Sequence, residues 1–534
     1  MGVMKFFKNK YSVAVLLITV FGALIRGYQL GRIPTSLNVD EVSIGYNAYS
    51  ILKTGADEYG VRFPLTFKSL GDYKPPLYIY LTSVSEYVFG LNEFAVRFPS
   101  FIFGVFLIPL VYFLITEISK SEKTAFFASL LLSVSPWGIW FSRVASEAMV
   151  ALFLLTLGLL FFLKSKGKLL PILISSVFFS LSGYTYHAEK IFVPLFAVFL
   201  AYIFRNRYGK KEIFLFLISI LVLSLPVYYE MLFGLGATRA KMTSIIYDQD
   251  FQRNVAVNYI GGKYLFLFFY WIRKYLAYFS PSFLFYQSLN LTEIFSGLGV
   301  LNFFEVPLLV SGVYALFKKR NNNTWLVIAW VLLGVLPASL TMNEQHPIRA
   351  MIILSPSVYI SALGLNHLTG FRILRKKAIV LPFLGFVVWN LTYSFLIFMV
   401  HNDYGRGENF MKGTKETVQY VLANQDKYKE IVFDARRGIK APDLINVPHL
   451  YLLFYSAYEP LKYQTTAKRE GGGIFGFDKY TVRNIDWGKD MNKKDTLFIG
   501  SQWYLPAEET KNVAILKKVY IGHDDLALII ATPK

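Results

Sequence analysis

The chain has 534 residues, of which 54% are hydrophobic, 17% aromatic and only 17% charged. Soluble domains average about 25% charged residues, and several apolar runs here reach the roughly 18 to 20 residues needed to cross a bilayer. This composition excludes an ordinary soluble protein and predicts an α-helical polytopic membrane protein. The chain contains no cysteine, which excludes disulfides, thiolate metal sites and cysteine nucleophiles.

The formal net charge of +20 reflects topology rather than a nucleic-acid partner. Most of the excess cations lie in short loops between apolar runs, as expected when basic loops stay in the cytoplasm. We therefore expect no nucleic-acid binding, a location in the cytoplasmic (inner) membrane, and an N-terminus inside the cell. The basic loops are 5–10, 120–123, 164–168, 205–211, 318–320 and 372–377.

Eleven transmembrane helices are predicted from the apolar runs. With the N-terminus inside, residues 30–95 form a first outer loop, and residues 141–146, 185–189 and 230–302 also lie outside. Residues 263–285 are apolar but carry Arg273-Lys274 in the middle, and a twelfth span there would turn the later basic loops outward. We expect an interfacial or re-entrant segment instead. The predicted spans are 11–29, 96–118, 124–140, 146–163, 169–184, 190–204, 212–229, 303–317, 324–340, 348–366 and 378–399.

An amphipathic helix is predicted within the first outer loop, directly after Pro75-Pro76, because proline suits a first helical turn. Apolar residues then follow helical spacing on one face, and polar residues fall on another, which is typical of a helix lying in the membrane interface. The apolar set is Leu77, Tyr80, Leu81, Val84, Tyr87 and Val88, and the polar set is Thr82, Ser85 and Glu86.

The composition changes near residue 401, where charged residues become frequent and apolar runs shorten. A helix is predicted at 415–424, with strands at Glu430–Ala435, Thr496–Gly500, Val513–Ile521 and Leu526–Ala531. The chain is thus divided into a transmembrane domain of residues 1–400 and a small extracytoplasmic α/β domain of residues 401–534, which we call the tail.

Polar residues that could carry chemistry gather on the predicted outer side. Asp40-Glu41 is either a solvated loop pair or a general base with a positioning partner, since a base must lie within hydrogen-bond reach of the proton it removes. Lys74 could extend its amine to the membrane surface or bind a lipid phosphate as a point charge. Arg349, near His346, could bind phosphate through two N–H groups or pair with a lipid headgroup.

Two tight outer turns supply further candidates. Arg143 and Glu147 have i, i+4 spacing and either pair with each other or belong to a site. Tyr184, Tyr186 and His187 fit the aromatic belt at the membrane interface, or a platform for a sugar or prenyl chain. His187 and Glu189 are too few to predict a metal site, so we expect no cofactor and leave a divalent metal as an open alternative.

These residues together resemble a known group, the GT-C glycosyltransferases that use polyprenyl-phosphate sugars. The resemblance rests on Asp40-Glu41 after the first span, on Tyr73–Tyr78, on Asn92–Ser100, and on Gly183–Leu195 and His346–Met351. It covers roughly residues 10–400 and is strongest to bacterial relatives of protein O-mannosyltransferases and of the lipid A aminoarabinose transferase. The first-loop pattern is fairly specific, whereas the later turns are less so.

The resemblance implies a GT-C-like fold, a polyprenyl-phosphate sugar donor and inversion at the anomeric carbon. By motif match, Asp40 would be the catalytic base, Glu41 its neighbour, and Lys74 a residue near the donor phosphate, with Glu147 as a second outer acid by position. The aminoarabinose transferase binds zinc through a ligand that precedes this lysine. This chain has Tyr73 at that position, so this zinc ligand does not carry over.

The resulting hypothesis is a membrane glycosyltransferase that moves a sugar from polyprenyl phosphate to an acceptor hydroxyl on a protein, lipid or glycan of the cell envelope. The alternatives are a lipid-linked sugar transporter or flippase, and a non-catalytic membrane scaffold that presents the tail. The predicted spans hold few ionisable residues, which argues against a proton-coupled transporter. No internal repeat of the kind common in transporters is evident.

Overall fold

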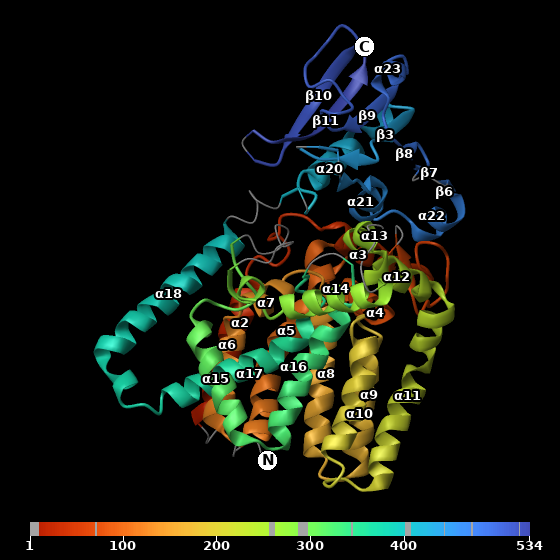
Figure 1. The fold of residues 1–534 in the computed structure, drawn as a ribbon. Coiled ribbons are helices and arrows are strands. Elements are labelled where there is room, and N and C mark those ends of the chain that lie inside the picture. Colours follow the sequence, from red (N-terminus) through yellow and green to blue (C-terminus); the bar gives the residue numbers. More distant parts are fainter. Residues whose placement is uncertain are drawn as a thin grey trace. The chain divides into compact units, whose positions relative to one another are not determined.

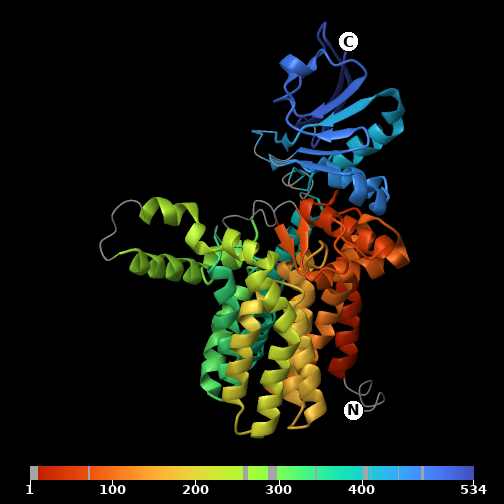
Figure 2. The same ribbon diagram turned by 90° about the vertical axis from the view of Figure 1, so that its right-hand side faces the viewer.

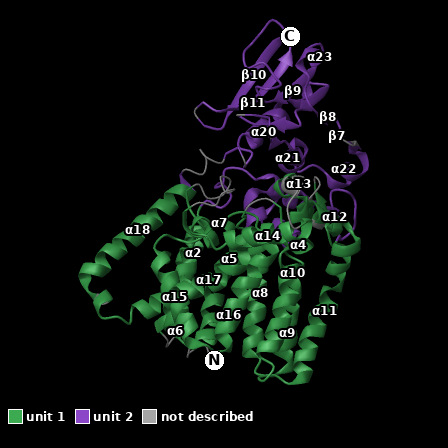
Figure 3. Ribbon diagram, in the orientation of Figure 1, with its two compact units in different colours: residues 1–28, 65–78, 99–398 green, residues 29–64, 79–98, 399–534 purple. Residues whose placement is uncertain are grey.

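The structure, a computed structural model, describes residues 10–69, 72–255, 262–286, 297–342, 345–400, 407–408, 410–439, 441–442, 444–470, 474–522 and 524–534. The chain forms two compact units, coloured separately in Figure 3. Unit 1 comprises residues 1–28, 65–78 and 99–398, and unit 2 comprises residues 29–64, 79–98 and 399–534. Unit 2 therefore combines the tail with most of the first outer loop. The predicted division near residue 400 stays a prediction.

Unit 1 is built mainly from long apolar helices, most of which run side by side in Figure 1, whereas α18 runs apart from them. Each of the eleven predicted spans coincides with helical structure, and seven helices among the described residues are long and apolar enough to cross a bilayer. The count of eleven spans stays a prediction. The helices are α2 Lys10–Gly27, α5 Glu93–Ser119, α6 Glu122–Ser133, α7 Pro136–Phe141, α8 Glu147–Lys164, α9 Leu169–Gly183, α10 Glu189–Ile203, α11 Lys210–Phe233, α15 Glu305–Lys319, α16 Asn322–Ser339, α17 Leu354–Leu368 and α18 Lys377–Met399.

Close helix packing in unit 1 depends on small residues where helices meet. Between α15 and α17, a Cβ on Gly312 would lie 1.9 Å from the Ile360 carbonyl oxygen, and one on Gly364 would lie 1.8 Å from that of Leu308. Any larger residue would push the two backbones apart. In lipid there is no hydrophobic driving force between helices, so they associate through van der Waals contacts. Small residues at the crossing allow the backbones to come close enough to make these contacts.

The predicted span 124–140 is divided into α6 and α7. The Ser135 hydroxyl accepts a hydrogen bond from the Gly138 backbone N–H at 3.2 Å, and Pro136 occupies the first turn of α7. A serine cap followed by proline begins a new helix, although the apolar run continues through it.

The long segment between α11 and α15 contains α12 Leu235–Thr243, η1 Ile245–Tyr247, α13 Gln249–Val255 and α14 Lys263–Ala277. In Figures 1 and 2, α14 runs across the direction of the long helices. One side of α14 packs on the protein, with Lys274 paired to Asp248 at 2.9 Å and the Trp271 indole N–H donating to Ser339 at 3.0 Å. Tyr264, Phe268 and Phe269 are exposed. A helix of 15 residues is about 22 Å long, shorter than the hydrocarbon core. Its interfacial position stays a prediction.

The first outer loop contains α3 Val39–Thr54, the short antiparallel pair β1 Phe67–Ser69 and β2 Asp72–Lys74, and α4 Pro76–Phe89. The predicted amphipathic helix is present as α4. Its apolar face is exposed and its polar face is buried, which is the reverse of the pattern in a soluble protein. Tyr87 is 78% exposed, whereas Thr82 and Glu86 are buried. An exposed apolar face and a buried polar face fit a helix that touches lipid.

The tail contributes a seven-stranded sheet to unit 2, in the order β10-β11-β9-β3-β8-β7-β6. Strand β3 runs parallel to β8 and β9, and the other pairs are antiparallel. The predicted helix and four strands are present as α20, β3, β9, β10 and β11. The elements are α20 Thr414–Asn424, β3 Glu430–Phe433, α21 Pro448–Tyr455, α22 Pro460–Thr466, β6 Lys468–Glu470, β7 Ile474–Phe477, β8 Tyr480–Val482, α23 Trp487–Asp490, β9 Thr496–Gly500, β10 Val513–Tyr520 and β11 Leu526–Pro533, with a separate pair β4 Arg436–Arg437 and β5 Leu444–Ile445.

Candidate functional site

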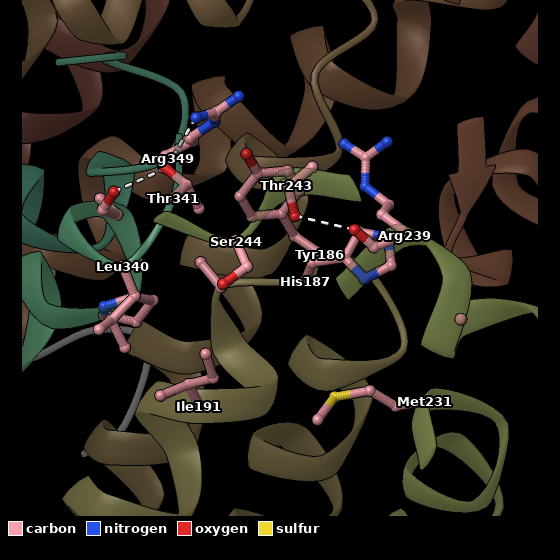
Figure 4. A pocket seen from close by; sticks show the side chains of 14 residues that line it. Tyr186, His187, Ile191, Met231, Arg239, Thr243, Ser244, Leu340, Thr341 and Arg349 are labelled. Atoms are coloured by element: carbon pink, nitrogen blue, oxygen red, sulfur yellow. Dashed lines mark hydrogen bonds between the residues drawn. The ribbon is translucent and has the colours of Figure 1, made fainter. Parts of the chain in front are cut away.

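Unit 1 contains a cavity of about 240 Å³ at the beginning of α10, beside α12 and the segment that follows α16. Figure 4 shows Arg349, Arg239 and Tyr186 toward one end, with Ile191 and Met231 toward the other. One end is therefore cationic and the other apolar. The lining residues are Tyr186, His187, Ala188, Ile191, Met231, Gly236, Arg239, Thr243, Ser244, Pro337, Ala338, Leu340, Thr341 and Arg349.

Backbone pairing fixes the cationic end. The Ile245 N–H donates to the Leu340 carbonyl at 2.9 Å, and the Met342 N–H donates to the Thr243 carbonyl at 2.7 Å. These bonds join the end of α12 to the chain that leads to Arg349. Arg349 Nη1 donates to the Thr341 hydroxyl at 2.7 Å and to the Met342 carbonyl at 3.0 Å. The guanidinium is thus held by one of its nitrogens at the cavity wall.

His187 connects the cavity to the strand that carries Lys74. Its Nε2 donates to the Tyr73 carbonyl at 2.8 Å, and Lys74 is only 4% exposed. Burial lowers the pKa of His187 to about 3; the ammonium groups of Lys190 and Lys74 act in the same direction, whereas the Tyr73 bond opposes them. His187 is therefore neutral at physiological pH. Strand β2 also packs against α12, the helix of Arg239.

Positive and negative groups both act on the Tyr186 phenol. Burial raises the pKa of its phenol, Arg349 lowers it, and the carboxylates of Glu189 and Glu147 raise it further. Glu189 is 1% exposed, and neither carboxylate oxygen has a hydrogen-bond partner in the described part of the chain. Unit 1 thus brings together five predicted residues, namely Lys74, Glu147, Tyr186, His187 and Arg349.

The other candidates in unit 1 have structural contacts. Arg143 is buried, and its Nη1 donates to the Ile25 and Arg26 carbonyls at 3.0 and 2.9 Å, at the end of α2. The Tyr184 hydroxyl donates to the Leu223 carbonyl at 2.8 Å, and the His346 backbone N–H donates to the Tyr278 hydroxyl at 3.2 Å. A catalytic part for these three residues stays a prediction.

The acidic pair belongs to unit 2, where its two members differ in environment. Asp40 is exposed in the first turn of α3. Glu41 is 1% exposed and completes a capping box with Asn38, in which each residue's side chain accepts from the other's backbone N–H. Glu41 also forms a buried ion pair with Arg97, at 2.9 and 3.2 Å. These contacts occupy the Glu41 carboxylate, whereas Asp40 faces solvent at a helix N-terminus that favours a negative charge.

Sequence reasoning missed Arg239 and Thr341 in the cavity and Arg97 beside the acidic pair. Arg97 lies within Asn92–Ser100, one of the stretches that carry the resemblance, but the sequence does not show that it pairs with Glu41. Arg239 lies in the long segment between α11 and α15, where the sequence has no recognisable motif. Among the described residues, no three His, Asp or Glu side chains are grouped so that they could hold a metal ion. The expectation of no cofactor stays a prediction.

The architecture defines an α-helical membrane protein with a GT-C fold and an additional β-sheet region. Residues 16–181 match the family model described as dolichyl-phosphate-mannose-protein mannosyltransferase. The structure is similar to ArnT from Cupriavidus metallidurans, with TM-scores of 0.55 for the apo form and 0.54 for the form bound to undecaprenyl phosphate. Sequence identity is 13%, and 97% of each chain is covered.

An uncharacterized protein of Aquifex aeolicus strain VF5 is 37% identical over 86 residues, which cover 16% of this chain and 17% of that protein. The resemblance to GT-C glycosyltransferases predicted from the sequence is confirmed by the family domain and by the fold. An identity of 13% establishes the fold alone, so the activity has to be argued from the site.

Proposed function

We propose that the protein is an inverting glycosyltransferase that moves a sugar from a polyprenyl-phosphate donor to an acceptor hydroxyl at the outer face of the cytoplasmic membrane. The observation that carries this proposal is the cavity of unit 1. It combines Arg239 and Arg349 with an apolar end lined by Ile191 and Met231, in a chain of membrane-spanning helices. A phosphate on a prenyl chain has the matching chemistry, with a charged head and an apolar tail.

The cationic end would stabilise charge that develops on the leaving polyprenyl phosphate. Preorganised charges act strongly where water is excluded, and they need no reorganisation as the bond breaks. Arg349 is preorganised by Thr341 and Met342, and Lys74 adds a buried ammonium group on β2. Phosphate is a good leaving group, so the mechanism requires no separate general acid.

Asp40 supplies the base in this proposal. Its exposed carboxylate would accept the proton of the acceptor hydroxyl while that oxygen attacks the anomeric carbon and the bond to phosphate breaks. A single displacement of this kind inverts the anomeric configuration. The acceptor is a hydroxyl of a protein, lipid or glycan in the cell envelope. In this proposal the N-terminus lies in the cytoplasm, and the tail lies on the outer side of the membrane with the acceptor.

The test uses purified protein in nanodiscs, a panel of polyprenyl-phosphate sugars and cell-envelope extract as acceptor. Release of polyprenyl phosphate is followed by mass spectrometry for the wild type, Asp40→Asn and the matched control Asp495→Asn, which changes an exposed acid of the tail. We expect release by the wild type and the control, and at least a hundredfold slower release by Asp40→Asn, the range for loss of a general base. Normal turnover by Asp40→Asn would refute the assignment of the base. Movement of the lipid without release would indicate a flippase.

A further inference from the structure

We propose that Tyr451, in the tail, is a positioning residue for the catalytic base: it fixes the backbone from which α3 begins and so holds Asp40 in place. The inference rests on the proposed function, because it assumes that Asp40 is the base. It gives the tail an indirect part in the reaction, through the backbone that precedes α3, which no feature of the tail sequence predicts.

The first observation is a buried hydrogen bond between two segments distant in sequence. The Tyr451 hydroxyl, on α21, donates to the Leu37 carbonyl at 2.7 Å, and both residues are completely buried. Leu37 immediately precedes Asn38, the N-cap of α3, and Asp40 follows two residues later. The position of the Leu37 backbone therefore determines the position of the N-cap and of the first turn of α3.

The second observation is that neighbouring carbonyls of this segment are bound from another direction. Arg97, on α5, donates to the carbonyls of Leu30, Pro34 and Ser36 at 3.1, 2.9 and 2.7 Å. The Ser36 and Leu37 carbonyls are consecutive, yet one is held by α5 and the other by α21. A backbone bound at adjacent peptide groups by two packed helices has little freedom to shift.

The acidic pair also acts electrostatically on the Tyr451 phenol. Burial raises the pKa of Tyr451 well above its ordinary value, and the carboxylates of Glu41 and Asp40 contribute in the same direction. The hydroxyl therefore remains protonated and remains a hydrogen-bond donor. The contact that this donor makes is with the Leu37 carbonyl, so the hydroxyl holds the backbone there.

The tail contacts α3 at other points, which supply matched controls. The Tyr46 hydroxyl, on α3, donates to the Tyr458 carbonyl at 3.2 Å, and Gln464 donates to the hydroxyls of Ser50 and Thr54 at 3.0 and 3.1 Å. These bonds join the same two parts of unit 2, but they lie one and a half turns or more beyond Asp40. They stabilise the contact without setting the start of the helix.

The functional consequence follows from geometry. A misplacement of about 1 Å can slow an oriented reaction by about a hundredfold. Removing the Tyr451 hydroxyl leaves a buried carbonyl without a partner, which favours any shift of Leu37 that finds water or another donor. The cavity of unit 1 is built from other residues, so donor binding should not change.

The experiment compares Tyr451→Phe with Tyr46→Phe in nanodiscs. Polyprenyl phosphate binding counts the folded sites, and kcat is expressed per binding site. We expect Tyr451→Phe to lower kcat about tenfold or more with an unchanged donor KM, and Tyr46→Phe to keep the wild-type kcat. Equal kcat values for the two variants would overturn the inference.

A double variant shows whether Tyr451 acts through Asp40. If it does, Tyr451→Phe combined with Asp40→Asn is no slower than Asp40→Asn alone, because the position of a missing base does not matter. An additional tenfold loss would indicate a merely structural role and would also overturn the inference. Full activity of Asp40→Asn alone would instead refute the proposed function, so the two failures are distinguishable.

Discussion

Replacing Glu41 and Asp40 in turn should separate the roles of two adjacent acids. Glu41→Gln keeps the size and one acceptor oxygen of the side chain but removes its charge. The guanidinium of Arg97, which is completely buried, then loses its counter-ion. Breaking a buried ion pair by removing one partner costs about 3 to 5 kcal/mol, because the remaining charge stays desolvated.

We expect the lower end of this range for Glu41→Gln, about 3 kcal/mol. Arg97 keeps three backbone carbonyl acceptors, and glutamine can still accept from the Asn38 backbone N–H in the capping box. Unit 2 has about 190 residues, for which 1 kcal/mol lowers the melting temperature by roughly 2 to 4 °C. The expected decrease is therefore about 6 to 12 °C. Asp40→Asn should change it by about 2 °C or less, since surface substitutions usually cost under 0.5 kcal/mol.

The assay is thermal unfolding in detergent, combined with amide hydrogen exchange over residues 30–41 and turnover at a temperature where both variants are folded. Asp40→Asn should lose turnover and keep its melting temperature, whereas Glu41→Gln should lose stability and keep measurable turnover per folded molecule. The reverse pattern would refute the reasoning, because it would make Glu41 the base despite its buried ion pair.

Three further outcomes are expected. Arg349→Lys should weaken polyprenyl phosphate binding about tenfold in a lipid-binding assay, because lysine keeps the charge but loses the planar group that holds Thr341 and Met342; unchanged affinity would contradict the site. Burial lowers the pKa of both His187 and His449 to about 3. The unfolded chain therefore binds protons first, so stability is complete above about pH 6.5 and is lost as the pH falls toward 3, by about 2 kcal/mol per histidine at pH 5. His187→Gln and His449→Gln should each reduce the decrease in melting temperature between pH 7 and pH 5, and an unaltered decrease would contradict the burial argument. The chain has no cysteine, so a single introduced cysteine can be labelled selectively. A fluorophore attached to Phe268→Cys should be quenched by brominated lipids, and one attached to the control Gln502→Cys should not. If only an aqueous quencher acted on the first label, α14 would lie away from the bilayer.

The sequence predicts the positions of the long apolar helices well, because such runs have one stable arrangement in lipid, with every backbone group bonded internally. It fails where a local signal interrupts the run, as at Ser135-Pro136, where one predicted span becomes two helices. In the tail, the longer strands β10 and β11 were predicted, whereas β6 and β8, three residues each, were not. Strands that short carry too few alternations to be distinguished from a loop.

In the candidate site, the sequence predicts residues that stand out by their own charge, but not roles that depend on partners distant in the chain. Asp40, Lys74 and Arg349 stand out as charged groups next to apolar runs. The difference between Asp40 and Glu41 does not, because it depends on Arg97, which is 56 residues from Glu41 in the chain. Arg239 was missed for the same reason, since its position at the cavity follows from the pairing of residues 243–245 with residues 340–342.

Arginine at the ends of the helices has two distinct uses in this protein, and the difference bears on where a phosphate would bind. Arg26 donates to the Leu132 and Ser133 carbonyls at the end of α6, and Arg143 donates to carbonyls at the end of α2. Helix C-termini carry partial negative charge, so these buried guanidinium groups stabilise the bundle. Arg349 and Arg239 instead line a cavity with an apolar end. Positive charge at the helix ends is therefore a poor guide to the donor site. The informative feature is a cation that lines a cavity with an apolar wall.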